Sequence, residues 1–538
     1  MKKILQGLLA TALVATSLSA KTYSSKTFLM PRSDNPNLAM EYTTWHRQIK
    51  LHDEDKFGGT IQAVPFYEES DNKKDLGKYF GIYNRIRNNQ IDDFIMVDDN
   101  DGSHLYTNDI IHFYSVDAYD STTFANANMS EKIQFRPYRT AYGVRLDYHQ
   151  KLDMLLDGLF LKVDAPIVHV KHSLGYKAIG RGITQKLALE AEFTLTGQSS
   201  LYIPASMTTG ADKSLEDYLT GNLVNTSTVA QQVALTHDKI HNGQDETGVA
   251  DVNVMLGYNL LYEADKQASF NIALLIPTGT TPDGVWKFEP VVGNGGHWAL
   301  GGGVDVYSKL WEKANKSLEV SFVANYKFLF SGTEKRTLNY KYPDYADFTY
   351  PDARVTWGQY VLGGHLGDTF ATPMANFTTI DVDVTPGSQI NAMIDLTFNW
   401  GNWSIDLGYE LYGQDQERVA VKSFTDNVYG IADWAWDTSL PFISGTTALY
   451  ETIFRGAYAA SWTTAFDMNR SAIDNSSLLP SDAETPQQIT NKVFGGLGYA
   501  FNSWNYPIMF GVGGSYEFAT GNVALEGWAA WFKAGLTF

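Results

Sequence analysis

The chain of 538 residues contains no cysteine, which excludes a disulfide scaffold, a thiolate metal site and a thiol nucleophile. Basic residues are also scarce, because 41 lysines and arginines stand against 60 aspartates and glutamates, and the formal net charge is −19. A protein that binds nucleic acid must neutralise a run of phosphates. This charge balance therefore argues against nucleic acid as a partner.

Long uncharged apolar runs are missing after residue 20, so no membrane-spanning helix is predicted there. Residues 1–20 combine Lys2 and Lys3 with an apolar stretch and the small pair Ser19-Ala20. This pattern predicts a secretory signal peptide. Export without cysteine fits a bacterial envelope, where the exported chain is either soluble or crosses the outer membrane with strands.

Aromatic residues are abundant, at 14% of the chain, and they alternate with other residues at the C-terminus. Even positions from Trp528 to Phe538 are apolar, whereas the odd positions Gly527, Ala529, Lys533, Gly535 and Thr537 are small or polar. This segment resembles the closing strand of Gram-negative outer-membrane β-barrels, although that family often has Gly where this chain has Lys533. The resemblance implies a bacterial outer-membrane location, with Phe538 as part of the signal read by the barrel-assembly machinery.

The same alternation recurs along the chain. An apolar face and a polar face over about ten residues are typical of transmembrane barrel strands. The predicted fold is all-β, a single closed antiparallel transmembrane β-barrel of 12–14 strands over residues 104–538. Twelve strands are predicted near 104–116, 132–149, 157–173, 252–260, 270–276, 298–306, 318–328, 390–400, 405–411, 489–501, 505–518 and 524–538.

The connections between these strands fall into two classes. Short turns are predicted near 150–156, 263–266, 312–316, 401–402 and 502–504, and long loops near 117–131, 174–248, 278–295, 332–386 and 415–487, with a tight exception at 520–522 on the long-loop side. Short turns at one end and long loops at the other are the periplasmic and extracellular ends of a bacterial barrel. Residues 21–103 are less clear. Segments 58–68 and 79–85 could add a hairpin, or the region could be an internal plug or a periplasmic extension.

Charged residues at inward positions predict a lumen with two sides. The early strands offer Arg139, Arg145, His149, Lys162, His169 and Lys171, and the later strands offer Asp305, Glu319, Asp395, Asp406 and Glu410. If basic and acidic sets face each other, they resemble the constriction of general porins. The first hypothesis is therefore a porin-like channel for passive diffusion of small polar solutes and ions. If the charges instead pair, they close a solid interior.

Two other functions stay open. The long outer loops near 174–248, 332–386 and 415–487 suit a surface structural or adhesive protein. Residues Leu275 to Gly284 and Gly293 to Trp298 resemble a pattern in outer-membrane transporters of hydrophobic solutes. No enzyme is predicted, because His237 and His241 lack the glutamate of the zinc-peptidase motif and no other catalytic set can be placed.

No cofactor or metal is expected, since diffusion follows the solute gradient. The expected partners are outer-membrane lipid and lipopolysaccharide, the export and assembly machinery, small solutes and further copies of the chain.

Overall fold

The structure is a computed structural model, and it describes fifteen stretches of the chain. These are residues 26–32, 37–44, 58–71, 76–77, 79–80, 95–98, 130–178, 215–222, 233–340, 358–360, 362–366, 372–431, 472–502, 506–519 and 523–538. Among them, no helix has the length and apolar character needed to cross a membrane.

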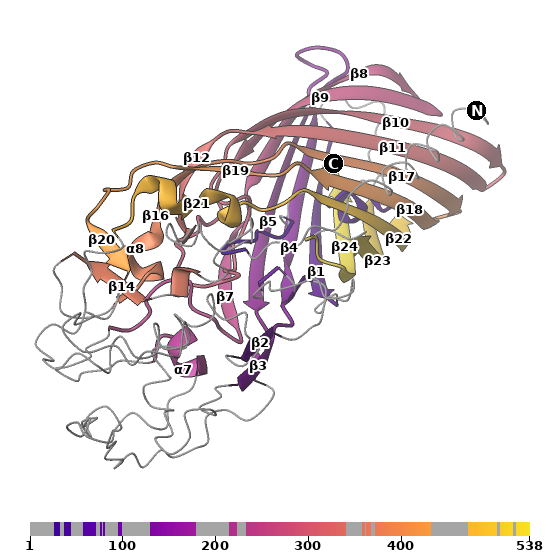
Figure 1. Cartoon of the computed structure of the whole chain (residues 1–538). Helices are drawn as coiled ribbons and strands as arrows, with labels where there is room; N and C mark the ends of the chain where they lie inside the picture. Colours follow the sequence, from indigo (N-terminus) through magenta and orange to yellow (C-terminus); the bar gives the residue numbers. More distant parts are fainter. Residues whose placement is uncertain are drawn as a thin grey trace, which may run out of the picture.

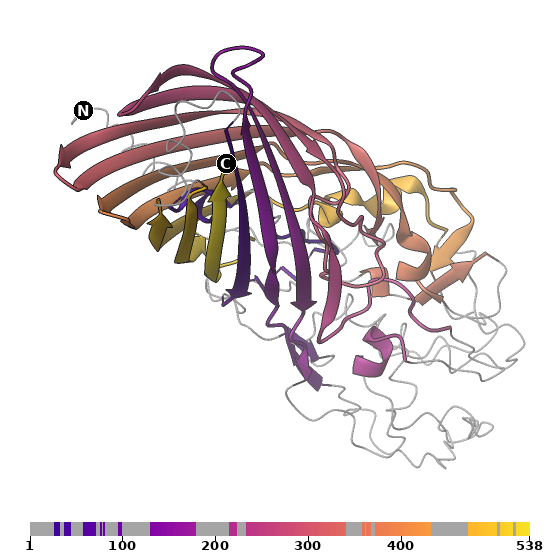
Figure 2. The same cartoon turned by 180° about the vertical axis from the view of Figure 1, so that it is seen from behind.

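Twelve strands form one closed antiparallel barrel, with its wall seen from two sides in Figures 1 and 2. The ring closes because β1 pairs with β24 on one edge and with β4 on the other. Closure gives every strand two neighbours, so lipid meets no open sheet edge. The strands are β1 (Gly59–Ser70), β4 (Tyr138–Lys151), β5 (Leu159–Ser173), β8 (Val252–Glu263), β9 (Lys266–Ile276), β10 (Ala299–Lys313), β11 (Lys316–Leu329), β17 (Gln389–Trp400), β18 (Trp403–Gln414), β22 (Gln488–Phe501), β23 (Ile508–Ala519) and β24 (Gly527–Thr537).

The predicted alternation of faces is confirmed in β24. Trp528 and Phe532 are 42% and 44% exposed on the outer face, whereas Trp531 and Lys533 on the inner face are 5% and 1% exposed. The other strands repeat this pattern, with large apolar side chains exposed all round the wall. Such a surface is stable only against hydrocarbon, so it is the lipid-facing surface of a membrane barrel.

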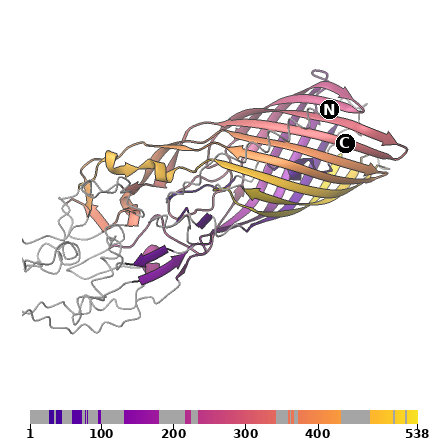
Figure 3. The same cartoon turned by 45° about the vertical axis from the view of Figure 1, so that its right-hand side comes forward.

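The two ends of the barrel differ as expected. At the periplasmic end short turns join β4 to β5, β8 to β9, β10 to β11, β17 to β18 and β22 to β23. At the extracellular end the connections are longer and carry structure of their own, except for the short one between β23 and β24, and Figure 3 shows them extending beyond the barrel wall.

The extracellular connections form small sheets and short helices. β7 (Gln244–Val249) pairs with the outer part of β5. The three-stranded sheets are β12 (Gly332–Thr337), β16 (Thr379–Thr385) and β19 (Arg418–Val421); β14 (Leu362–His365), β15 (Thr372–Pro373) and β20 (Tyr429–Ile431); and β2 (Ile95–Asp98), β3 (Ser130–Gln134) and β6 (Lys177–Ala178). The remaining elements are β13 (Asn339–Tyr340), β21 (Leu478–Leu479), α7 (Leu215–Leu219), α8 (Ala375–Thr378), η1 (Gly358–Tyr360), η2 (Asn475–Ser477) and η3 (Pro480–Ala483).

The N-terminal part of the barrel differs from the expectation. The predicted strand near 104–116 lies outside the described residues, and β1 is the strand between β24 and β4. β1 does not form a hairpin with residues 79–85, because both of its edges are already paired. Residues 79 and 80 form a turn, and the rest of that segment lies outside the described residues.

Candidate functional site in the barrel lumen

A short helix before β1 lies inside the barrel. Asn37 begins α2 (Leu38–Tyr42), because its side chain accepts a hydrogen bond from the backbone N–H of Met40 at 3.2 Å and caps the helix. All five helical residues are buried. Thr43 and Thr44 follow and lie against glycines of β22 and β23, where a Cβ on Gly496 would come within 2.1 Å of Thr43. The lumen wall therefore has a hollow that fits this segment.

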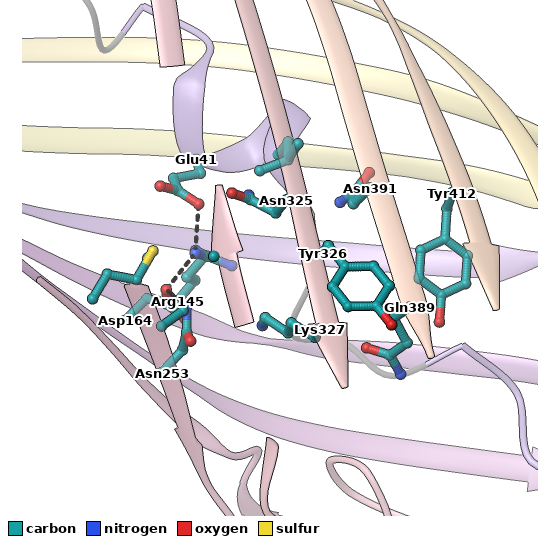
Figure 4. A pocket seen from close by; sticks show the side chains of 14 residues that line it. Glu41, Arg145, Asp164, Asn253, Asn325, Tyr326, Lys327, Gln389, Asn391 and Tyr412 are labelled. Carbon is teal, nitrogen blue, oxygen red and sulfur yellow. Dashed lines mark hydrogen bonds and ion pairs between the residues drawn. The ribbon is translucent and has the colours of Figure 1, made fainter. Parts of the chain in front are cut away.

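Glu41 of α2 is the centre of a buried ion network. Its carboxylate lies 3.1 Å from Arg145 Nη2 on β4 and 2.8 Å from Lys162 Nζ on β5. A third cation, Lys533 on β24, donates to the backbone oxygen of Glu41 at 2.9 Å. Arg145 also meets Asp164 at 3.4 Å, and Figure 4 shows the three side chains of Glu41, Arg145 and Asp164 converging. Three barrel strands thus hold the helix in place.

Arg32 makes a second ionic contact between this segment and the wall. Its guanidinium lies 2.6 Å from Glu410 on β18 and 2.8 Å from Glu517 on β23, and it stacks over the ring of Tyr412 at 4.3 Å. Lys492 on β22 lies 3.1 Å from the same Glu517. The cation of the segment is therefore balanced by acids on the wall opposite β4 and β5.

Residues 26–30 lie among the extracellular loops. Lys26 Nζ donates to the backbone oxygen of Ser481 at 2.7 Å, and Thr27 N donates to that of Asp482 at 3.0 Å. The backbone N–H of Gly59, at the start of β1, donates to Phe538 at the periplasmic end. Residues 26–32 and 37–44, which we call the lumen segment, therefore extend from the extracellular loops into the barrel, and β1 begins at the opposite rim.

The inner wall beneath α2 carries an apolar strip. It crosses four neighbouring strands, with Phe66 of β1 opposite Trp531 of β24 and Ala141 of β4 opposite Val170 of β5. Leu38 and Met40 of α2 pack in the same cluster. We define the apolar strip as Val64, Phe66, Ala141, Val168, Val170, Ala529 and Trp531, all at most 8% exposed.

A cavity of about 30 Å³ lies between α2 and the other side of the wall. We call it the lumen cavity, and Figure 4 shows the side chains that line it. A cavity of this size has room for one or two water molecules. Most of the residues around it are of polar type, although apolar atoms form the larger part of its surface. The lining residues are Leu38, Glu41, Arg145, Asp164, Asn253, Met255, Ala273, Gly302, Asn325, Tyr326, Lys327, Gln389, Asn391 and Tyr412.

The structure brings part of the predicted basic set together. Arg145 and Lys162 meet at Glu41. Arg139 lies nearer the extracellular end, 3.3 Å from Glu68. His149 is buried towards the periplasmic end, with its ring centroid 5.3 Å from that of Phe160. The predicted basic wall is therefore spread along the length of the barrel.

The prediction that Lys171 faces the lumen is wrong. Lys171 is exposed, on the same face of β5 as His169, whose ring lies 4.7 Å from the exposed ring of Tyr142. Lys162 and Lys171 are nine residues apart, and strand side chains alternate with a period of two, so they must point to opposite faces. Lys171 and His169, which were both predicted to face inward, therefore lie outside the lumen.

The predicted acidic residues lie on the inner face, and two of them are neighbours. The Thr397 hydroxyl lies between them, 2.8 Å from Asp406 and 3.2 Å from Asp395, and can donate its one proton to either carboxylate. Glu410 meets Arg32, and Glu319 accepts a hydrogen bond from Ser317 at 3.1 Å. Asp305 lies between the outward-facing Val304 and Val306.

On both sides of the lumen, acidic and basic side chains form ion pairs with near neighbours on the same side. On the basic side Arg145 is 2.7 Å from Asp147, and on the acidic side Lys492 is 3.1 Å from Glu517.

Sequence reasoning missed Glu41, Arg32 and Lys533 as site residues. Glu41 and Arg32 lie outside any strand pattern, so no periodicity indicated which way they face. Lys533 did carry a signal, because it is a charged residue in a closing strand where the outer-membrane family often has Gly. Its partner is a backbone oxygen of the lumen segment, which the sequence of β24 cannot show.

An extracellular ion network fastens the outer loops to the lumen segment. Glu334 on β12 meets His297 at 2.7 Å and Arg336 at 2.8 Å, and Arg336 also meets Glu417 at 2.8 Å. The Arg336 guanidinium stacks over the ring of Phe28 at 3.8 Å. We call His297, Glu334, Arg336 and Glu417 the outer network.

Glu289, in the loop between β9 and β10, is expected to titrate near neutral pH. Burial raises its pKa to about 8, and the charge of Asp283 adds to the shift. The loop therefore loses stability as the pH rises from the ordinary carboxyl pKa of 4.5 to about 8, because over that range the unfolded carboxyl is ionised while the folded one still holds its proton. We expect Asp283→Asn to lower the pKa of Glu289, measured by carbon-13 NMR of labelled glutamate. Asp381→Asn, in a different loop, is the control, and a pKa of Glu289 that Asp283→Asn leaves unchanged would contradict the assignment.

Among the described residues, no three His, Cys, Asp or Glu side chains gather as a metal site. No family model and no curated protein matches the sequence. Solved structures match the fold distantly. An outer membrane channel from Pseudomonas putida F1 has 10% identity and a TM-score of 0.35, over 89% of this chain and 96% of that one.

Two further structures are similar to this chain at a comparable level. The toluene transporter TodX of Pseudomonas putida has 10% identity and a TM-score of 0.30, over 97% and 98% of the two chains. A FadL homologue of Pseudomonas aeruginosa has 6% identity and a TM-score of 0.27, over 91% and 92%. Similarity this low carries no argument about function. The closed ring of twelve strands, its apolar outer surface and its unequal ends identify the chain as a bacterial outer-membrane β-barrel protein.

Proposed function

We propose that this barrel is a transporter that moves small, mainly apolar solutes across the outer membrane, and that the lumen segment closes it at rest. The observation that carries the proposal is the apolar strip. A barrel whose only task is to pass polar solutes has no use for seven buried apolar side chains on its inner wall. Water wets such a surface poorly, whereas an apolar solute gains free energy by covering it.

The lumen segment supports a closed resting state. Leu38 and Met40 belong to the same buried apolar cluster as the apolar strip, and Glu41 and Arg32 fix the segment to different strands of the wall. Displacing the segment would uncover the apolar strip for a solute. No enzymatic step is part of this proposal. Its partners are the solute, outer-membrane lipid and lipopolysaccharide, and the assembly machinery that reads Phe538.

Passive diffusion of polar solutes is the second candidate, because the lumen cavity is lined mainly by polar side chains. The selectivity residues of that candidate would be Arg145, Lys162 and the acids that face them. The two candidates differ in what wild-type protein does in a planar bilayer. A passive porin conducts steadily, whereas a closed transporter conducts little.

The test replaces Val168 and Val170 by threonine. Threonine has the shape of valine, but its hydroxyl must be stripped of water when an apolar solute covers it, at a cost of about 1 kcal/mol or more. We expect wild-type protein to raise uptake of a labelled aromatic hydrocarbon by whole cells, and the double variant to lower that uptake about fivefold. Val421→Thr on β19 is the matched control outside the barrel. If the double variant takes up hydrocarbon as fast as wild type, and wild-type protein conducts steadily in a planar bilayer, the result would favour a passive porin instead.

A further inference from the structure

The turn between β4 and β5 is unlike the periplasmic turns that follow β8, β10 and β17. It consists of residues 152–158, which we call the apolar turn, and Met154, Leu155 and Leu156 at its centre are 63%, 74% and 54% exposed. The other three turns are only two residues long and carry no large apolar side chain: 264–265, 314–315 and 401–402. Large apolar side chains are unfavourable in water, so three of them on one turn indicate a contact outside the chain.

Hydrogen bonds within the apolar turn give it a defined shape. Leu155 and Leu156 donate from their backbone N–H groups to the carbonyl oxygen of Leu152, at 2.8 and 3.2 Å. The side chain of Asp153 accepts a hydrogen bond from the backbone N–H of Gly158 at 2.8 Å. A segment that leaves water must satisfy its polar backbone groups by itself, and these bonds do so for three of the N–H groups of the turn.

The apolar turn lies beside the lipid-facing surface of β8. The backbone N–H of Asn259 on β8 donates to the carbonyl oxygen of Gly158 at 2.8 Å. The next residue of β8, Leu260, is 70% exposed, and Leu256 on the outer face of the same strand is 51% exposed. In Figures 1 and 2 the apolar turn projects from the outer edge of the barrel near the ends of β8 and β9. The exposed leucines of β8 therefore continue into the apolar turn.

The apolar surface of the wall reaches as far towards the periplasm as the apolar turn does. Leu159, the first residue of β5, pairs with Tyr258, and β8 continues beyond this pair to Glu263. Near the periplasmic end of β10, Leu310 and Trp311 are still 41% and 44% exposed. Exposed apolar side chains on a barrel wall meet lipid, and exposed tryptophan marks the membrane interface. The apolar turn is therefore level with the interface.

We propose that the apolar turn inserts into the phospholipid leaflet on the periplasmic side of the outer membrane and anchors the barrel there. Met154, Leu155 and Leu156 contact the acyl chains together with Leu260 of β8, while the exposed Asp157 stays among the lipid headgroups. A lipid surface is the partner because the same membrane already covers the neighbouring strand. This anchor is independent of which solute the barrel transports.

The test uses the absence of cysteine from the chain, because a single introduced cysteine can then carry a nitroxide spin label without background. Full-length Leu155→Cys is labelled and reconstituted into phosphatidylcholine vesicles. Electron paramagnetic resonance measures how often the label collides with oxygen, which dissolves in hydrocarbon, and with a neutral nickel chelate, which stays in water. We expect the ratio of oxygen to chelate collisions to be about tenfold higher than for a label in water, because hydrocarbon excludes polar solutes.

Two matched variants provide the reference values. Leu256→Cys on the outer face of β8 gives the ratio for lipid, and Asn315→Cys in the turn between β10 and β11 gives the ratio for water. Met154→Cys provides the measurement on the apolar turn if Leu155→Cys does not fold. A ratio equal to that of Leu256→Cys supports the proposal. A ratio equal to that of Asn315→Cys would overturn it and would leave a periplasmic protein as the partner of the apolar turn.

Discussion

Replacing Glu41 by alanine is expected to convert a closed barrel into a conducting one. The change removes the carboxylate that Arg145 and Lys162 share. Arg145 keeps Asp147 at 2.7 Å, whereas buried Lys162 loses its ion pair and keeps the neutral hydroxyl of Tyr42 at 2.7 Å. Breaking a buried ion pair in this way costs about 3–5 kcal/mol. If that cost falls on the closed state, the population of displaced segment rises about a hundredfold or more, since 1.4 kcal/mol is a factor of ten. We therefore expect the current per molecule in a planar bilayer to rise at least tenfold.

The matched control is Glu312→Ala at the periplasmic end of β10. Glu312 also pairs with a lysine, Lys309, at 2.9 Å, but its side chain is 58% exposed. Exposed pairs contribute little, so this variant should conduct like wild type. If Glu41→Ala inserts correctly and its current stays at the wild-type level, the lumen segment is not what closes the barrel.

Replacing Arg336 by methionine is expected to loosen the extracellular loops while the barrel stays intact. The change leaves Glu334 and Glu417, each 2% exposed, without their shared cation. It also removes the stacking over Phe28, which connects the outer network to the lumen segment. The local cost is about 3–5 kcal/mol. We expect limited proteolysis of the extracellular loops to become at least tenfold faster.

The heat-dependent gel mobility that reports a folded barrel should not change in Arg336→Met, because all twelve strands keep their pairing. Arg418→Met removes an exposed arginine from neighbouring β19 and is the matched control. Equal proteolysis of the two variants would show that the outer network does not hold the loops together. Loss of the folded-barrel mobility would show that the network stabilises the barrel itself.

Most of the fold could be predicted from the alternation of apolar and polar residues along the strands, and β24 shows why. Its outer residues face lipid and its inner residues face the lumen, so the alternation of Trp528 and Phe532 with Lys533 is visible in the sequence. The same rule places Lys171 outside, and counting residues from Lys162 would have been enough to show it. β1 was harder, because Pro65 and Glu69 interrupt its alternation, and its identity depends on pairing with β24 and β4.

The candidate site was much less visible. Arg145 and Lys162 were predicted to face the lumen, and they do, but their shared partner Glu41 belongs to a helix of five residues before the first strand. Asp164 and Asn253 come together only because β5 and β8 lie side by side and bring their side chains to one cavity. The residue pattern within either strand does not predict this contact.

By itself, the sequence determined that the chain is an exported barrel, which face of most strands meets lipid, and which end carries the long loops. These properties follow from the alternation of apolar and polar side chains with a period of two, which is visible within the roughly ten residues of each strand. Only the tertiary structure decided that the lumen segment lies inside the barrel, and that Glu41 meets cations more than a hundred residues away. Contacts of that kind depend on ring closure and on the packing of one segment against many strands.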